Sequence, residues 1–87
     1  MKIKSGFILR NVGGENVVVP VGERSKEFHC MINLNETGAF LWKFFKVEHT
    51  IDEAVEALCG EYDVSSEIAR ADVERLAQVL LDNKLAE

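Results

Sequence analysis

The spacing of apolar residues changes once along this chain, near Leu34, and that change constrains the fold more than any other feature. Before Leu34, short apolar runs alternate with turn-forming clusters, as in β-strands. After it, apolar residues recur every three or four positions, as in amphipathic helices. The 87 residues suffice for one small core. We therefore expect one domain over residues 1–87 with an α+β fold, in which a small sheet precedes a helical part.

Three short strands are predicted in the first part, over residues 7–10, 16–19 and 28–34. Gly13 and Gly14 supply the turn between the first two, and a polar loop over residues 22–27 leads to the third. Along the third strand, Phe28, Cys30, Ile32 and Leu34 alternate with His29, Met31 and Asn33. Successive side chains of a strand point to opposite faces, so the first set should face the core. We expect the three strands to form one antiparallel sheet.

Three helices are predicted in the second part. Asn35 is a suitable N-cap for the first, which contains the apolar segment 40–45. Thr50 and Glu53 have the spacing of a capping box that begins the second helix. Gly60 stands where a glycine would end that helix.

The last helix is expected over residues 65–83, and Leu85 should fold back onto the core after it. Its inward face is formed by Ala69, Val73, Leu76, Ala77 and Leu80. Beside that face runs a stripe that is half apolar and half charged, made of Ile68, Asp72, Arg75 and Val79. If the third strand lies at a sheet edge beside this helix, the two bound a groove where an extended peptide could add as a strand. The alternative is that these residues serve packing and solvation alone.

Few side chains are placed to do chemistry. His29 and Cys30 are neighbours on a predicted strand, so their side chains point to opposite faces and form no catalytic dyad. The acidic cluster at residues 52–56 is explained by a charged first helical turn. We therefore expect no catalytic residue, no metal site and no cofactor, and hence no enzyme.

The two cysteines, Cys30 and Cys59, lack the spacing of a metal site. We expect two buried free thiols, with a disulfide as the alternative. No apolar run is long enough to span a bilayer, and no apolar signal segment follows Met1. Together these features predict a soluble, cytoplasmic protein.

Charge is unevenly distributed along the chain. Residues 1–49 have a net charge of +2 and residues 50–87 have one of −7. An acidic half is a poor surface for nucleic acid, because contacts of Lys and Arg with phosphates dominate that affinity. The predicted last helix also has two arginines against four acidic residues. A winged-helix DNA-binding or regulatory domain is nevertheless the alternative function, and tight binding to duplex DNA would support it.

Several segments, taken in order, resemble the PqqD family. They are residues 32–42 (INLNETGAFLW), 50–55 (TIDEAV), 62–64 (YDV), 72–73 (DV) and 83–87 (NKLAE). The corresponding family pattern is Leu-Asn-x-Thr-Gly-x-x-x-Trp, Thr-x-x-Glu-Ile, Tyr-x-Val, and Asp-Val ahead of a terminal Gly-Leu-Leu. Lys84 stands in place of that glycine, and Ala86 in place of the second leucine.

The resemblance implies a winged-helix-like fold, with a three-stranded antiparallel sheet followed by a three-helix bundle. It also implies a non-catalytic protein that binds the leader of a ribosomally synthesised precursor peptide. The leader would add as a strand beside the third strand, facing the last helix. The residues implied for peptide binding are Phe28, His29, Cys30, Met31, Ile32 and Asn33 on the strand and Asp72, Arg75, Leu76 and Val79 on the helix, to which the stripe adds Ile68.

The same resemblance implies two partners, the precursor peptide and a modifying enzyme that receives it, often a radical SAM enzyme. Nucleic acid and membrane are not expected as partners, and the chain should be a monomer or a weak homodimer. The pathway can be PQQ synthesis or that of another modified peptide. A further alternative is a subunit that binds only its enzyme, in which case a leader would leave the third strand unaffected.

Overall fold

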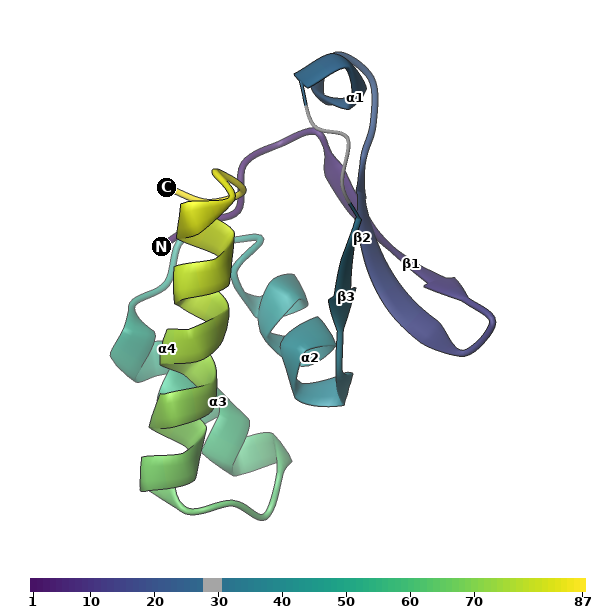
Figure 1. Ribbon diagram of the computed structural model, residues 1–87. Helices are drawn as coiled ribbons and strands as arrows, with labels where there is room; N and C mark the ends of the chain where they lie inside the picture. The colour runs from purple at the N-terminus through teal and green to yellow at the C-terminus, as the bar shows by residue number, and fades with distance from the viewer. Residues whose placement is uncertain (28–30) are drawn as a thin grey trace.

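The computed structural model describes residues 1–27 and 31–87. Its strands are β1 (Phe7–Val12), β2 (Glu15–Pro20) and β3 (Ile32–Leu34), and its helices are α1 (Arg24–Glu27), α2 (Glu36–Phe44), α3 (Ile51–Glu61) and α4 (Ser66–Asp82). The sheet stands beside the three longer helices, with α2 between the sheet and the pair α3–α4 (Figure 1). This arrangement confirms the predicted α+β fold, although the described residues form four helices rather than three.

The sheet is open and antiparallel, with the strand order β1-β2-β3. In the β1–β2 hairpin, Phe7 pairs with Pro20 and Val12 pairs with Glu15. Gly13 and Gly14 make the turn with φ values of 60° and 86°, a left-handed conformation that glycine adopts at little cost. The predicted glycine turn is confirmed. Both strands extend beyond their predicted bounds, because the ladder continues up to this tight turn.

Within the described residues, β3 covers Ile32–Leu34 of the strand predicted over residues 28–34. Residues 28–30 lie outside the described residues, and Met31 precedes the strand. Ile32 pairs with the buried Val18, so it faces the core side of the sheet as predicted, although it is only half-buried. Among the described residues, β3 pairs with β2 alone and therefore forms an edge of the sheet.

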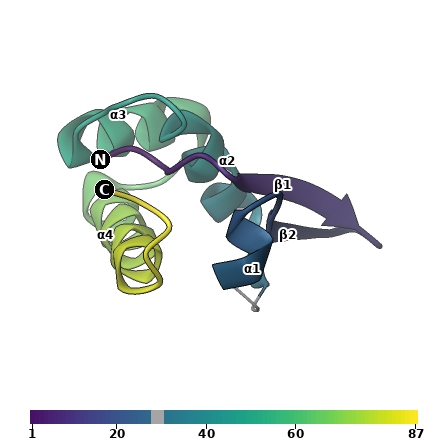
Figure 2. The same cartoon turned by 90° about the horizontal axis from the view of Figure 1, so that it is seen from above.

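Helix α1 corrects the predicted loop over residues 22–27. Its turn is closed by Ser25, whose amide and hydroxyl both donate to the carbonyl of Gly22, at 3.1 and 2.6 Å. Arg24 donates from Nε to the carbonyl of Ser5 at 3.1 Å, which ties α1 to the start of β1. One helical turn is too short to show a helical period in the sequence. Seen from above, α1 lies at the end of the sheet where β1 begins (Figure 2).

The predicted starts of the two middle helices are confirmed. The Asn35 side chain accepts from the Gly38 amide at 2.8 Å at the start of α2. At the start of α3, the Glu53 amide donates to Thr50 Oγ1 at 3.1 Å, and the Thr50 amide donates to Glu53 Oε1 at 2.8 Å. That second bond, together with the charge of His49, lowers the pKa of Glu53 from its ordinary value of 4.5. The two capping interactions are thus both formed as the sequence predicted.

The predicted end of α3 at Gly60 is wrong. The helix continues through Gly60 to Glu61, and Tyr62 is its C-cap, with its amide donating to the carbonyl of Leu58. The Tyr62 ring packs edge-on against Phe40 of α2 at a centroid distance of 5.8 Å. This packing is a tertiary contact, so a local glycine signal could not predict where the helix ends.

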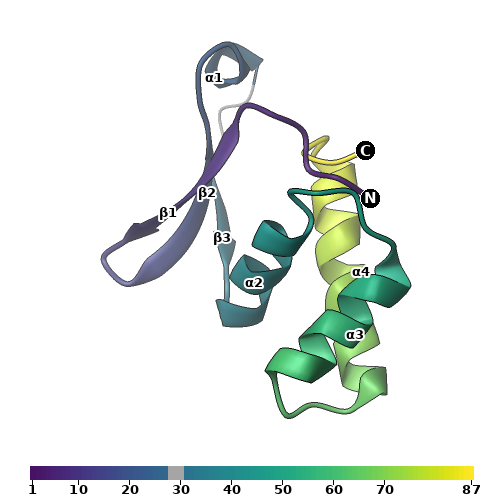
Figure 3. The same ribbon diagram turned by 180° about the vertical axis from the view of Figure 1, so that it is seen from behind.

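The core is formed mainly by the helices. Its largest fully buried side chains are Trp42, Phe45, Leu41, Leu58, Leu80 and Val73. The five residues predicted for the inward face of α4 are all buried. Figure 3 shows α3 and α4 against each other, on the far side of α2 from the sheet.

The two ends of the chain meet beside the end of α4. Ile3 and Ala86 form an antiparallel bridge, and Leu85 is 3% exposed, as predicted. Lys84, which replaces the family's glycine, has a φ of 61°, in the left-handed region that favours glycine. Its conformation gives the physical reason for a glycine at this position in the family pattern.

Two other predictions concern the cysteines and membrane-spanning segments. Cys59 is a free, half-buried thiol rather than a fully buried one, and Cys30 lies outside the described residues. None of the described helices is both long and apolar enough to cross a membrane.

Candidate functional site

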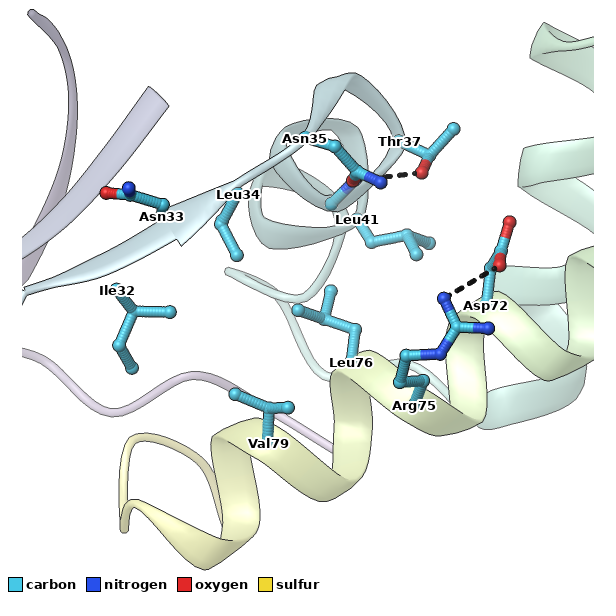
Figure 4. A pocket seen from close by; sticks show the side chains of 11 residues that line it. Ile32, Asn33, Leu34, Asn35, Thr37, Leu41, Asp72, Arg75, Leu76 and Val79 are labelled. Atoms are coloured by element: carbon cyan, nitrogen blue, oxygen red, sulfur yellow. Dashed lines mark hydrogen bonds and ion pairs between the residues drawn. The ribbon is translucent and has the colours of Figure 1, made fainter. Parts of the chain in front are cut away.

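A groove of about 330 Å³ lies between β3 and α4, and the first turns of α2 line it as well (Figure 4). It is lined by Ile32, Asn33, Leu34, Asn35, Thr37, Gly38, Leu41, Asp72, Arg75, Leu76 and Val79. Strand β3 and helix α4 run in opposite directions along it (Figure 1). The structure therefore places a strand edge and one face of an amphipathic helix opposite each other.

The groove changes from apolar to polar along its length (Figure 4). Its three levels are made of Ile32 and Val79, then of Leu34, Leu41 and Leu76, and finally of Asn35, Thr37, Asp72 and Arg75. We call the first two levels the apolar end and the third level the polar end. Leu41 and Leu76 belong to the core, so the floor of the apolar end is held rigidly by packing.

The polar end contains one ion pair. Arg75 Nη1 lies 3.4 Å from Asp72 Oδ1, one helical turn away on α4. The Arg75 side chain is 71% exposed and that of Asp72 is 27% exposed. Arg75 is the one cation among the described residues that line the groove. The pair is mostly solvated on the arginine side, so it contributes little to stability.

Gly38 allows α2 to begin close to the end of β3. A Cβ at this position would lie 3.0 Å from Asn35 Oδ1 and 3.3 Å from Leu34 Cβ. A side chain here would press on the N-cap of α2 and on the wall of the groove. The close approach also places Thr37, whose hydroxyl donates to Asn35 Oδ1 at 3.2 Å, at the polar end.

The sequence-predicted site residues divide into three groups. Those that line the groove are Ile32, Asn33, Asp72, Arg75, Leu76 and Val79. Met31 is 69% exposed and precedes β3, and Ile68 is exposed one turn before Asp72, so neither lines the groove. Phe28, His29 and Cys30 lie outside the described residues.

Sequence reasoning missed that the end of β3 and the start of α2 line the groove. The missed residues are Leu34, Asn35, Thr37, Gly38 and Leu41. A signal for them existed, because four of them lie in the Leu-Asn-x-Thr-Gly segment and Asn35 was predicted as an N-cap. The cap predicts that a helix begins there, whereas only packing shows that its first turns face α4.

Both arginines of α4 form ion pairs. Arg70 Nη2 lies 2.7 Å from Asp52 Oδ1 of α3, and Arg75 pairs with Asp72, so both arginines of this helix have carboxylate partners. The hydrogen bond from Arg70 to Asp52 raises the pKa of Arg70. In the part of the chain that the structure describes, no three His, Cys, Asp or Glu residues are grouped so that they could hold a metal ion.

Comparisons with known proteins give one matching family model and one solved structure of similar fold. The family model described as "Coenzyme PQQ synthesis protein D (PqqD)" matches residues 15–86. A solved structure described as "TbiB1 in Complex with the TbiA(beta) Leader Peptide" is similar to this chain with a TM-score of 0.75 and 22% identity. The match covers 100% of this chain and 95% of that one, and at this identity the likeness concerns the fold. No curated protein sequence matches the chain.

Proposed function

The chain belongs to the PqqD family, and on that premise we propose that it binds the leader of a ribosomally synthesised precursor peptide and presents it to a modifying enzyme of the radical SAM class. The role is one of binding, because a strand edge and an apolar groove supply affinity for a peptide. The chemistry is left to the enzyme that receives the peptide.

The observation that carries this proposal is the open edge of β3 opposite α4. A strand edge offers backbone groups to an added strand, and alternate side chains of that strand then enter the neighbouring pocket. In this chain, β2 occupies one side of β3, and the groove of about 330 Å³ adjoins the other. TbiB1, which shares this fold, was solved in complex with a leader peptide.

The DNA-binding alternative has no observation in its favour. Arg70 and Arg75 are the two cations of α4, and each pairs with a carboxylate. A recognition helix normally brings free basic side chains to the DNA backbone and bases.

The proposal is tested by titrating the ¹⁵N-labelled chain with the leader of each short precursor peptide that a search of the neighbouring genes identifies. We expect a Kd of about 1 μM or lower, which corresponds to about 8 kcal/mol. Amide signals of β3 and α4 should shift together, and a scrambled leader of the same composition should shift neither. Shifts that cluster on α3 would contradict the groove assignment, and tight binding to duplex DNA without leader binding would contradict the function.

A further inference from the structure

We propose that the groove selects leaders with two apolar residues two positions apart and an acidic residue two positions beyond them, whose carboxylate Arg75 binds. This inference rests on the proposed function, because it concerns the side chains of a peptide already added to β3. Strand addition alone gives the polar end of the groove no role, and this inference assigns it one.

The apolar part of the pattern follows from the spacing of the groove. Every second residue of an added strand faces the groove, and such residues lie ~6.6 Å apart. The first would contact Ile32 and Val79, and the second would contact Leu34 and Leu76. Two apolar side chains spaced two positions apart therefore match the two apolar levels.

The next inward residue, four positions from the first, reaches the polar end. Val79 and Asp72 are separated along α4 by ~10 Å at the helical rise of 1.5 Å per residue. Strand residues four positions apart are separated by ~13 Å. The long Arg75 side chain can span the difference between these two lengths. Side chains of a helix point towards its N-terminus, and Arg75 accordingly leans towards Asp72 (Figure 4).

Hydrogen-bonding capacity at the polar end favours an acidic residue. Asn35 Oδ1 already accepts from the Gly38 amide at 2.8 Å and from the Thr37 hydroxyl at 3.2 Å. The guanidinium of Arg75 has five N–H donors, and its contact with Asp72 at 3.4 Å involves one nitrogen. A ligand that only accepts hydrogen bonds therefore suits this end, and a carboxylate can accept two from one guanidinium.

Asp72 is better placed to orient Arg75 than to bind a cation itself. Its side chain is 27% exposed, and its charge is compensated by Arg75. A cationic leader residue would have to displace Arg75 or meet its like charge. An acidic leader residue would meet the Arg75 side chain, which is 71% exposed and is held on one side by Asp72.

The order of the pattern depends on the direction in which the leader adds. The sheet is antiparallel throughout, and antiparallel pairing is the more stable per residue. If the leader lies antiparallel to β3, its N-terminal part lies at the polar end of the groove. Its acidic residue would therefore come first in the leader sequence, two positions before one apolar residue and four before the other.

The test is a selection from a display library of random fifteen-residue peptides on the wild-type chain and on Arg75→Gln and Arg75→Glu, with Arg75→Lys as the charge-preserving control. Wild type and Arg75→Lys should enrich Asp or Glu at the predicted offset from the apolar pair. Arg75→Gln should lose this preference, and Arg75→Glu should enrich Lys or Arg there. For the best wild-type peptide, replacing the acidic residue by its amide should weaken binding about tenfold on wild type and much less on Arg75→Gln.

The outcomes separate this inference from the function on which it rests. Selected peptides that shift β3 and α4 amides but show no acidic preference, or prefer Lys or Arg on wild type, would overturn the role of Arg75 and leave the proposed function standing. Selection of no peptide that shifts these amides would overturn both. Thermal unfolding of each variant verifies that it is folded, which is expected because Arg75 is exposed.

Discussion

Ser65 shows how single side chains set the limits of the helices in this protein. Its Oγ accepts from the Ile68 amide at 3.2 Å, one of the first amides of α4, which have no partner within the helix. Asn35 and Thr50 do the same for α2 and α3. At the scale of one residue, each cap satisfies an amide donor three positions along the chain. Its formation therefore does not depend on the remaining fold.

The two adjacent serines at the start of α4 allow a matched test of this effect. Ser65→Ala removes the cap and should lower the free energy of unfolding by about 1 kcal/mol. Ser66→Ala changes the same atoms at the first helical position and should have little effect, because alanine has the higher helix propensity. Urea denaturation followed by the fluorescence of the buried Trp42 measures both. Equal losses in the two variants would contradict the assignment of Ser65 as the cap.

At the scale of an element, the edge strand β3 is the feature that the proposed function uses. Its residues Ile32 and Leu34 line the groove with their side chains, while the same stretch of backbone would pair with the leader. Side chains and backbone thus make separable contributions to one binding event, the first to selectivity and the second to affinity.

A proline tests the contribution of the backbone. Met31→Pro removes one backbone amide donor just before β3, and if the leader pairs there its binding should weaken about tenfold. Met31→Ala keeps the donor and removes the side chain, and it should bind as wild type does. Isothermal titration with the leader gives both Kd values, and thermal melts show whether either variant is destabilised. Equal affinity of the two variants would argue against pairing at this position.

At the scale of the whole molecule, the ends of the chain close the structure around α4. The amide of Lys4 donates to the carbonyl of Leu85 at 2.9 Å, and Ile3 bridges to Ala86. Leu85 belongs to the same buried cluster as Val18 of the sheet and Trp42 of α2. Residues that follow the last helix therefore help to join the sheet to the helices.

The stability that the chain end contributes can be predicted from the burial of its side chains. Leu85→Ala should lower the free energy of unfolding by about 2–5 kcal/mol, a large share of the stability of a small domain. Leu81→Ala should cost clearly less, because Leu81 is 46% exposed whereas Leu85 is 3% exposed. Urea titrations followed by Trp42 fluorescence and by far-ultraviolet circular dichroism should give coincident transitions for each variant. Separate transitions would show that the domain does not unfold as one cooperative unit.

Features that depend on neighbouring residues could be predicted from the sequence. These are the change from strands to helices near Leu34, the caps at Asn35 and Thr50, the Gly13–Gly14 turn and the inward face of α4. Each rests on interactions within about four positions of the chain or on a repeating period, both of which are visible in a sequence.

Features that depend on contacts between distant residues became visible only in the folded chain. Helix α3 continues past Gly60 to the cap at Tyr62, whose ring packs against Phe40, and Arg24–Glu27 fold into α1 beside the start of β1. The fold also brings the first turns of α2 to the groove, because Gly38 lets them approach Leu34 closely. The sequence could indicate a strand edge and a helix face, but their distance and the polar end between them arise only when the core packs.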